Sequence, residues 1–113
     1  MAYNNAVLVE KSIFSGIASD AAGDSEVIIL KGASKLSCQA YWTVDTPSGA
    51  TITFKGSNDQ INWTNLESAT AITVAGNVLF QDADVSYLYF KAVKAISTGD
   101  ATVQAVIAVI GDA

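Results

Sequence analysis

Residues 52–63 read Ile-Thr-Phe-Lys-Gly-Ser-Asn-Asp-Gln-Ile-Asn-Trp. Apolar and polar side chains alternate at the start of this stretch, which places Ile52 and Phe54 on one face of a predicted strand. The Gly-Ser-Asn-Asp segment at 56–59 supplies the residue types that reverse the backbone between antiparallel strands. The stretch therefore predicts a half-buried strand, a turn, and a short return strand that carries Trp63.

The rest of the chain repeats this pattern. Short stretches of strand-forming residues are separated by turn residues at fairly regular intervals, and no stretch sustains helical spacing. This rhythm is typical of a β-sandwich or barrel, so we expect an all-β fold: one antiparallel β-sandwich, Ig-like or jelly-roll-like, of about seven or eight strands. The predicted strands are 6–14, 26–31, 35–45, 50–55, 61–66, 86–95 and 101–110, together with 71–74 and 77–80 on either side of a turn or bulge at Ala75-Gly76.

Two details of the strand arrangement follow from the pattern. Residues 35–45 alternate cleanly, and the turn residues at 46–49 lead from them into 50–55, so these two strands are predicted to form a hairpin. The run Val27-Ile28-Ile29-Leu30 is apolar on both faces, which predicts a central or sandwiched strand.

Length and composition fit one domain that spans residues 1–113, with 1–9 as an extended N-terminal arm. Half of the residues are apolar and 15% are charged, compared with roughly 25% charged residues in ordinary soluble domains. This surplus indicates that some apolar surface contacts another chain, such as a further copy of the same protein. A compact sandwich with a rich core is the other interpretation.

The charged residues exclude several classes of function. The net charge is −5, with no basic run, so we expect no nucleic-acid partner. The chain has no histidine and no arginine, and its one cysteine, Cys38, lies in an apolar strand pattern without a partner base, so we expect no enzyme and no cofactor. The apolar stretch at 103–110 is far shorter than the ~20 residues of a membrane span, and the N-terminus lacks a secretory pattern. We expect no membrane partner, and synthesis and folding in a reducing cytoplasm.

The order of motifs resembles a small β-sandwich module that is common in structural proteins of tailed bacteriophages. That module carries similar SNDG-x-x-W, Y-x-R and S-G-T-x-T-V signatures. The resemblance covers about the C-terminal half of this chain, with Gln60 in place of the usual glycine and Lys91 in place of arginine. The matching residues are Gly56, Ser57, Asn58, Asp59, Trp63, Tyr87, Tyr89, Lys91, Ser97, Gly99, Ala101, Thr102 and Val103.

The resemblance implies a non-enzymatic structural protein of the virion. Because the chain begins with Met1 and ends soon after its last strand, we expect a free-standing capsid decoration or cement protein that stabilises a phage head through subunit contacts. Its expected partners are the major capsid protein or other virion proteins, and copies of itself. The expected interface residues are Val7 and Val9 in the N-terminal arm, Val106, Ala108 and Ile110 on the second face of the last strand, and the outward tyrosines Tyr41, Tyr87 and Tyr89.

Two other readings use the same residues. In the alternative function, a tail- or fibre-associated carbohydrate-binding module, aromatic side chains form a stacking platform. The candidates for it are Trp42, Trp63, Tyr41, Tyr87 and Tyr89, although the two tryptophans are expected in the core. A calcium site would need the turn at Asn58, Asp59 and Asn62 to meet Asp82 and Asp84. Because Asn and Asp at turns normally bond their own backbone, we expect no metal site.

Overall fold

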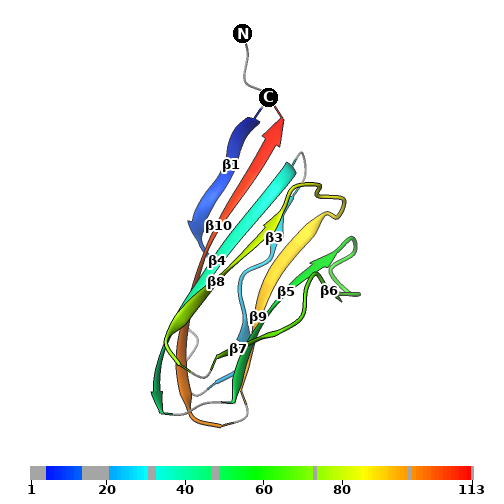
Figure 1. The fold of residues 1–113 in the computed structure, drawn as a ribbon. Coiled ribbons are helices and arrows are strands. Elements are labelled where there is room, and N and C mark those ends of the chain that lie inside the picture. Colours follow the sequence, from blue (N-terminus) through cyan, green and yellow to red (C-terminus); the bar gives the residue numbers. More distant parts are fainter. Residues whose placement is uncertain are drawn as a thin grey trace.

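The computed structural model describes residues 5–13, 21–30, 33–46, 49–72, 74–96 and 98–112. Two antiparallel sheets lie face to face in these residues, which confirms the predicted all-β sandwich (Figure 1). The described ranges contain ten strands and no helix, and three of the strands are only two residues long. Such short strands carry no alternation of their own, so the sequence predicted fewer.

The four-stranded sheet has the two longest strands at its centre. β4 (Ala33–Thr46) and β10 (Asp100–Asp112) pair antiparallel along almost their whole length. β1 (Asn5–Ser12) pairs with β10 at one edge, and β8 (Gly76–Asp82) pairs with β4 at the other. The molecule is 51 Å long, and a strand of the length of β4 spans roughly 46 Å at about 3.3 Å per residue. This sheet therefore sets the length of the molecule.

The six-stranded sheet is built on the pair β5 (Ala50–Ser57) and β9 (Tyr89–Ala95). Four short strands complete it on the two outer sides of that pair. They are β2 (Gly23–Asp24) and β3 (Ile28–Ile29), which pair with β9, and β6 (Thr64–Asn65) and β7 (Thr70–Ile72), which pair with β5.

Three phenylalanines join the two sheets at the centre of the core. Phe54 in β5 and Phe90 in β9 stack on each other and on Phe80 in β8, with ring centroids 5.3 to 6.0 Å apart. The inward face of β4 packs beside them and includes Trp42, which is 6% exposed. Trp42 is thus a core residue, as predicted.

The predicted hairpin of 35–45 with 50–55 is wrong, because β4 and β5 belong to different sheets. Each strand has one apolar face: Cys38 and Ala40 in β4 are fully buried, as are Ile52 and Phe54 in β5. Two such apolar faces are both buried when they pack against each other across a sandwich. Alternation shows which face of a strand is buried, but it does not show which strand lies beside it.

The predicted central strand at 26–31 is also wrong. Its residues form β3, which pairs with β9 at the margin of the sheet, and Ile29 is 65% exposed there. Trp63 departs from its predicted core position as well, since it is only half-buried. The exposure of Ile29 follows from the marginal position of β3, where a strand meets solvent. Trp63 lies just before β6, outside the strands.

The chain changes sheets between 71–74 and 77–80, where a turn or a bulge was predicted. β7 pairs with β5 and β8 pairs with β4, so the segment between them crosses the sandwich. At this crossing the indole Nε1 of Trp42 donates a 2.8 Å hydrogen bond to the carbonyl of Val74. The core tryptophan thereby fixes the connection between the sheets.

Candidate functional site

The outer face of the four-stranded sheet carries most of the predicted interface residues. Val106 in β10 is 39% exposed and Tyr41 in β4 is 46% exposed. The residues that precede and follow each of them in the sequence are buried. Leu79 in β8 is 49% exposed on the same face. Together with the half-buried Ala108 and Ile110 these residues form what we call the outer patch.

The register of the strands shows how the outer patch is arranged. Val106 lies opposite Gln39, and Gln39 lies opposite Leu79, so one row crosses β10, β4 and β8. A shallow hollow of about 210 Å³ follows this row and the neighbouring row through Ser37 and Ala108. The sequence analysis did not name Leu79 as an interface residue. Because neighbouring side chains of a strand point to opposite faces, the buried Phe80 places Leu79 on the outer face.

The predicted N-terminal arm lies partly within the sheet. The backbone from Asn5 onward belongs to β1, where Val7 is the register partner of Ile110 and Val9 that of Val109, with a register shift between them. The side chains of Val7 and Val9 and the whole of residues 1–4 lie outside the described residues. The backbone of the arm therefore continues the sheet next to the outer patch.

The three predicted outward tyrosines lie on different surfaces. Tyr41 is in the outer patch, whereas Tyr89 is half-buried on the outer face of the other sheet, between Ile29 and Ser57. Tyr87 precedes β9 and packs over Gly56. The tyrosine part of the predicted stacking platform is therefore not assembled, because Tyr41 and Tyr89 face opposite sides of the sandwich.

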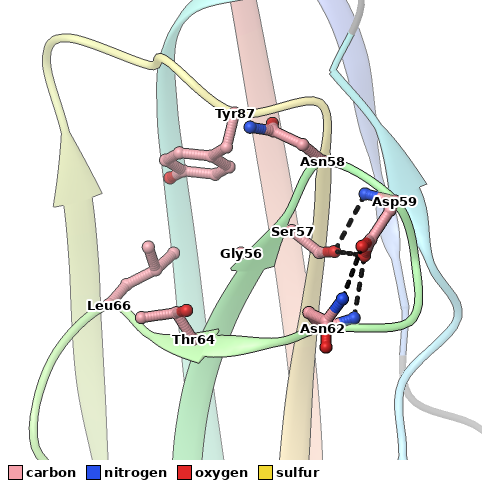
Figure 2. Close-up of a pocket in the computed structure, with 8 residues that line it drawn as sticks. All are labelled: Gly56, Ser57, Asn58, Asp59, Asn62, Thr64, Leu66 and Tyr87. Atoms are coloured by element: carbon pink, nitrogen blue, oxygen red, sulfur yellow. Dashed lines mark hydrogen bonds between the residues drawn. The ribbon is translucent and has the colours of Figure 1, made fainter.

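The turn after β5 is organised by one carboxylate (Figure 2). Asp59 accepts hydrogen bonds from the backbone N–H groups of Ile61 and Asn62, both at 2.8 Å, from the Asn62 side-chain amide at 2.7 Å, and from the Ser57 hydroxyl at 2.9 Å. These donors hold the pKa of the Asp59 carboxyl well below its usual range. Gln60, which replaces the usual glycine of the resembled motif, has a positive φ of 61° here.

The segment before β9 closes over this turn. The backbone N–H of Leu88 donates to the side-chain oxygen of Asn58 at 3.0 Å and to the carbonyl of Ser57 at 3.2 Å. The Tyr87 hydroxyl donates to Asp82 at 2.9 Å. Burial, together with the hydrogen bond and charge of Asp82, raises the pKa of Tyr87 above its usual range. A pocket of about 340 Å³ remains between the turn, β6 and the ring of Tyr87.

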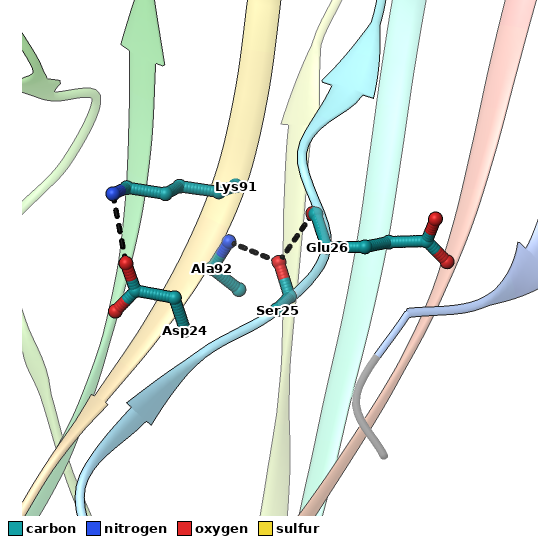
Figure 3. A network of polar contacts seen from close by, with 5 residues as sticks. All are labelled: Asp24, Ser25, Glu26, Lys91 and Ala92. Atoms are coloured by element: carbon teal, nitrogen blue, oxygen red, sulfur yellow. Dashed lines mark hydrogen bonds and ion pairs between the residues drawn. The ribbon is translucent and has the colours of Figure 1, made fainter. Parts of the chain in front are cut away.

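Lys91 links three separate segments on the outer face of the six-stranded sheet. Its ammonium group forms a 2.8 Å ion pair with Asp24 (Figure 3). The same group lies 4.4 Å from the centroid of the Trp63 ring. The lysine that replaces the arginine of the resembled motif thus forms an ion pair and a cation–π contact. These contacts explain the half-buried position of Trp63.

Lys94 is a residue whose position the sequence analysis missed. It is 1% exposed on the inward face of β9, and its ammonium group donates to the carbonyl of Ala101 in the facing sheet. The spacing Phe90, Ala92, Lys94 already places it on the inward face.

The thiol of the one cysteine lies away from solvent. Cys38 is fully buried, and burial raises the pKa of its thiol to about 12. Within the described ranges there is no group of three or more His, Cys, Asp or Glu residues that could hold a metal ion. In the same ranges we find no helix with the length and hydropathy of a membrane span.

No protein-family model matches the chain, and no curated protein matches it. Solved structures with a similar fold include the SPBc2 prophage-derived protein YomS, with 17% identity, a TM-score of 0.59, and coverage of 88% of this chain and 93% of YomS. The PBSX exported protein XepA has 13% identity and a TM-score of 0.60 over 96% of this chain, which spans 37% of XepA. The Yersinia pseudotuberculosis-derived mitogen has 10% identity and a TM-score of 0.52, with coverage of 96% and 86%. At these identities the similarity is one of fold.

Proposed function

We propose that the chain is a non-enzymatic structural protein of a phage virion, and that it decorates the head by binding the major capsid protein through the outer patch. The observation that carries the proposal is the row across β10, β4 and β8 that exposes Val106 and Leu79. Exposed apolar side chains that gather on one sheet face are typical of a protein contact. The fold shared with a prophage-derived protein supports the virion setting.

A flat, partly apolar sheet face suits attachment to a lattice. A decoration protein binds many equivalent positions, so each contact needs only modest affinity, and bound copies stabilise the folded shell by mass action. Gln39 and Ser37 separate the apolar side chains of the outer patch and supply polar groups for hydrogen bonds at such an interface. Copies of the chain in contact with one another on the shell would bury further parts of the same face.

The first test is to count copies of the chain per particle by quantitative peptide mass spectrometry on purified virions, relative to the major shell protein. Hundreds of copies support decoration of the head, and a few tens support a tail or fibre component. Absence of the chain from the particles would overturn the virion proposal.

A matched pair of variants tests the docking surface. Val106→Asp places a charge in the outer patch, and Ile29→Asp places one at a more exposed apolar position on the other sheet. Both variants should fold, because both side chains are exposed. We expect Val106→Asp to reduce the copies retained on particles at least about tenfold, since it buries an unpaired charge at the interface. Retention of Val106→Asp at the level of Ile29→Asp would contradict the assignment of this face.

A further inference from the structure

The pocket behind the turn after β5 lies away from the outer patch. It is formed by the end of β5, by β6 and by the segment before β9 (Figure 2), and β6 lies on the side of the molecule opposite β1 (Figure 1). Docking through the four-stranded sheet leaves this pocket open. Its volume of about 340 Å³ lies at the lower end of the range of ligand pockets.

The apolar part of the pocket is preformed. Gly56 is buried, and a Cβ atom built on it would lie 2.9 Å from Cδ2 of Tyr87 and 3.1 Å from Cδ2 of Leu66. The tyrosine ring and the leucine therefore rest directly on the glycine backbone. The hydrogen bond from the Tyr87 hydroxyl to Asp82 fixes the far end of the ring. A ligand would thus meet an aromatic ring that is already held in place.

The rim of the pocket offers polar groups that the turn itself does not use. The Asn58 amide accepts from Leu88 through its oxygen, and the Asn62 amide donates to Asp59 through its nitrogen. Among the residues that the structure describes, the Asn58 NH₂ group, the Asn62 oxygen and the Thr64 hydroxyl have no hydrogen-bond partner. The rim therefore provides a donor, an acceptor and a group that can act as either.

The charges around the pocket favour a neutral ligand. Asp59 is its one ionisable side chain apart from the hydroxyl of Tyr87, and both Asp59 oxygens already accept hydrogen bonds within the turn. No lysine lines the pocket, so a phosphate or carboxylate group would find no cation. Neutral hydroxyl groups match the amide and hydroxyl groups of the rim, and an apolar ring face matches the tyrosine.

We propose that this pocket binds a neutral saccharide unit, with one face of the sugar ring against Tyr87 and its hydroxyl groups bonded to Asn58, Asn62 and Thr64. The proposal goes beyond virion attachment and does not depend on it. It also replaces the surface platform of tyrosines with a single site at the turn.

The test is a titration of the ¹⁵N-labelled protein with neutral sugars, followed by two-dimensional NMR. The probes are glucose, galactose, N-acetylglucosamine, maltose and cellobiose at millimolar concentration, with glucuronic acid as the charged comparison. We expect at least one neutral sugar to give saturable shifts that are confined to amides of residues 56–66 and 85–88. Shifts elsewhere, a response to glucuronic acid alone, or no response to any neutral sugar would overturn the proposal.

Two near-isosteric variants assign the binding to the rim. Asn58→Asp keeps the oxygen that accepts from Leu88 but removes the NH₂ donor, and Thr64→Val removes the exposed hydroxyl. Each should weaken sugar binding about tenfold, which corresponds to one lost hydrogen bond. The matched controls are Asn77→Asp, which keeps the oxygen that accepts from Gln39, and Thr43→Val on the outer face of β4. Equal effects of the controls and the rim variants would overturn the assignment.

The same variants separate this site from virion attachment. Asn58→Asp and Thr64→Val should stay on particles at the wild-type copy number, whereas Val106→Asp should keep its affinity for the sugar. Loss of sugar binding in Val106→Asp with an unchanged fold would contradict the pocket as the binding site.

Discussion

Asp59 holds the turn after β5 through four hydrogen bonds to its carboxylate. Since these bonds lower the pKa of the folded-state carboxyl, the stability that they contribute is present above the unfolded pKa of about 3.9 and is lost as pH falls below it. We expect Asp59→Asn to be less stable than the wild type at neutral pH, with a difference that shrinks toward about pH 2. Urea denaturation across this pH range measures the difference.

The control for this prediction is Asp84→Asn, which changes an exposed aspartate in the bend after β8. There the backbone N–H of Asp84, rather than its carboxylate, forms the hydrogen bond with Asp82. Its stability should stay close to that of the wild type. A difference between Asp59→Asn and the wild type that persists unchanged at low pH would show that the turn does not depend on the charge.

Gly56 and Gly76 form a natural pair for testing close packing. A Cβ at Gly56 would lie 2.9 Å from the ring of Tyr87, whereas at Gly76 its nearest neighbour would be Nε1 of Trp42 at 3.6 Å, an ordinary contact. We expect Gly56→Ala to lower the free energy of unfolding by about 1–3 kcal/mol and Gly76→Ala to change it by less than about 0.5 kcal/mol. Equilibrium denaturation of both variants decides this, and equal effects would show that Tyr87 and Leu66 move aside without cost.

Single residues also show where sequence reasoning succeeds. The Gly-Ser-Asn-Asp segment predicts the turn correctly, because its side chains bond the backbone within four residues of themselves. The hydrogen-bond partner of Lys94 could not be found in this way, since the bond to the Ala101 carbonyl depends on how the two sheets meet. Local bonds are visible in a sequence, whereas bonds across the sandwich are not.

At the scale of strands, β2 and β3 depend on Ser25 for their attachment to β9. Ser25 is buried, donates its backbone N–H to the carbonyl of Ala92 at 2.8 Å, and accepts the Ala92 N–H through its hydroxyl at 2.9 Å (Figure 3). Its hydroxyl also donates to the Glu26 carbonyl. We expect Ser25→Ala to cost about 1–3 kcal/mol, because the Ala92 N–H is left buried without a partner.

Denaturation measures the cost of Ser25→Ala, and hydrogen exchange of the Ala92 amide locates it. Ser68→Ala, at an exposed position, serves as the control and should be nearly neutral. If the Ala92 amide stayed as protected as in the wild type, Ser25 would not be what attaches this segment.

Strand existence and strand partnership differ in how far the sequence reveals them. β4 and β10 were predicted nearly to their observed ends, because their alternation is long and regular. The partner of β4 was predicted to be β5, the next strand in the sequence, but β4 pairs with β10 and β8. Which strands pair is decided by apolar faces that meet across the core, and these come from distant parts of the chain.

For the whole molecule, the sequence predicted an all-β sandwich and an apolar outer face on its last strand, and the structure has both. It did not reveal the row from Val106 to Leu79, because that row exists only when β10, β4 and β8 lie side by side. It likewise did not reveal the pocket, which needs Tyr87 to pack over Gly56. Surfaces assembled from several strands depend on the order of the strands in the sheet. The alternation of apolar and polar residues does not predict that order.

The charge distribution of the molecule predicts how its attachment responds to salt. The chain carries a net charge of −5, while the row at the centre of the outer patch consists of Val106, Gln39 and Leu79, all uncharged. Contacts of this kind depend on buried apolar area and are not screened by ions, unlike contacts between surface charges. We therefore expect decorated particles that are washed at about 0.1 M and at about 1 M NaCl to keep the same number of copies. Release of the chain at high salt would show that charged residues, rather than the outer patch, hold it on the shell.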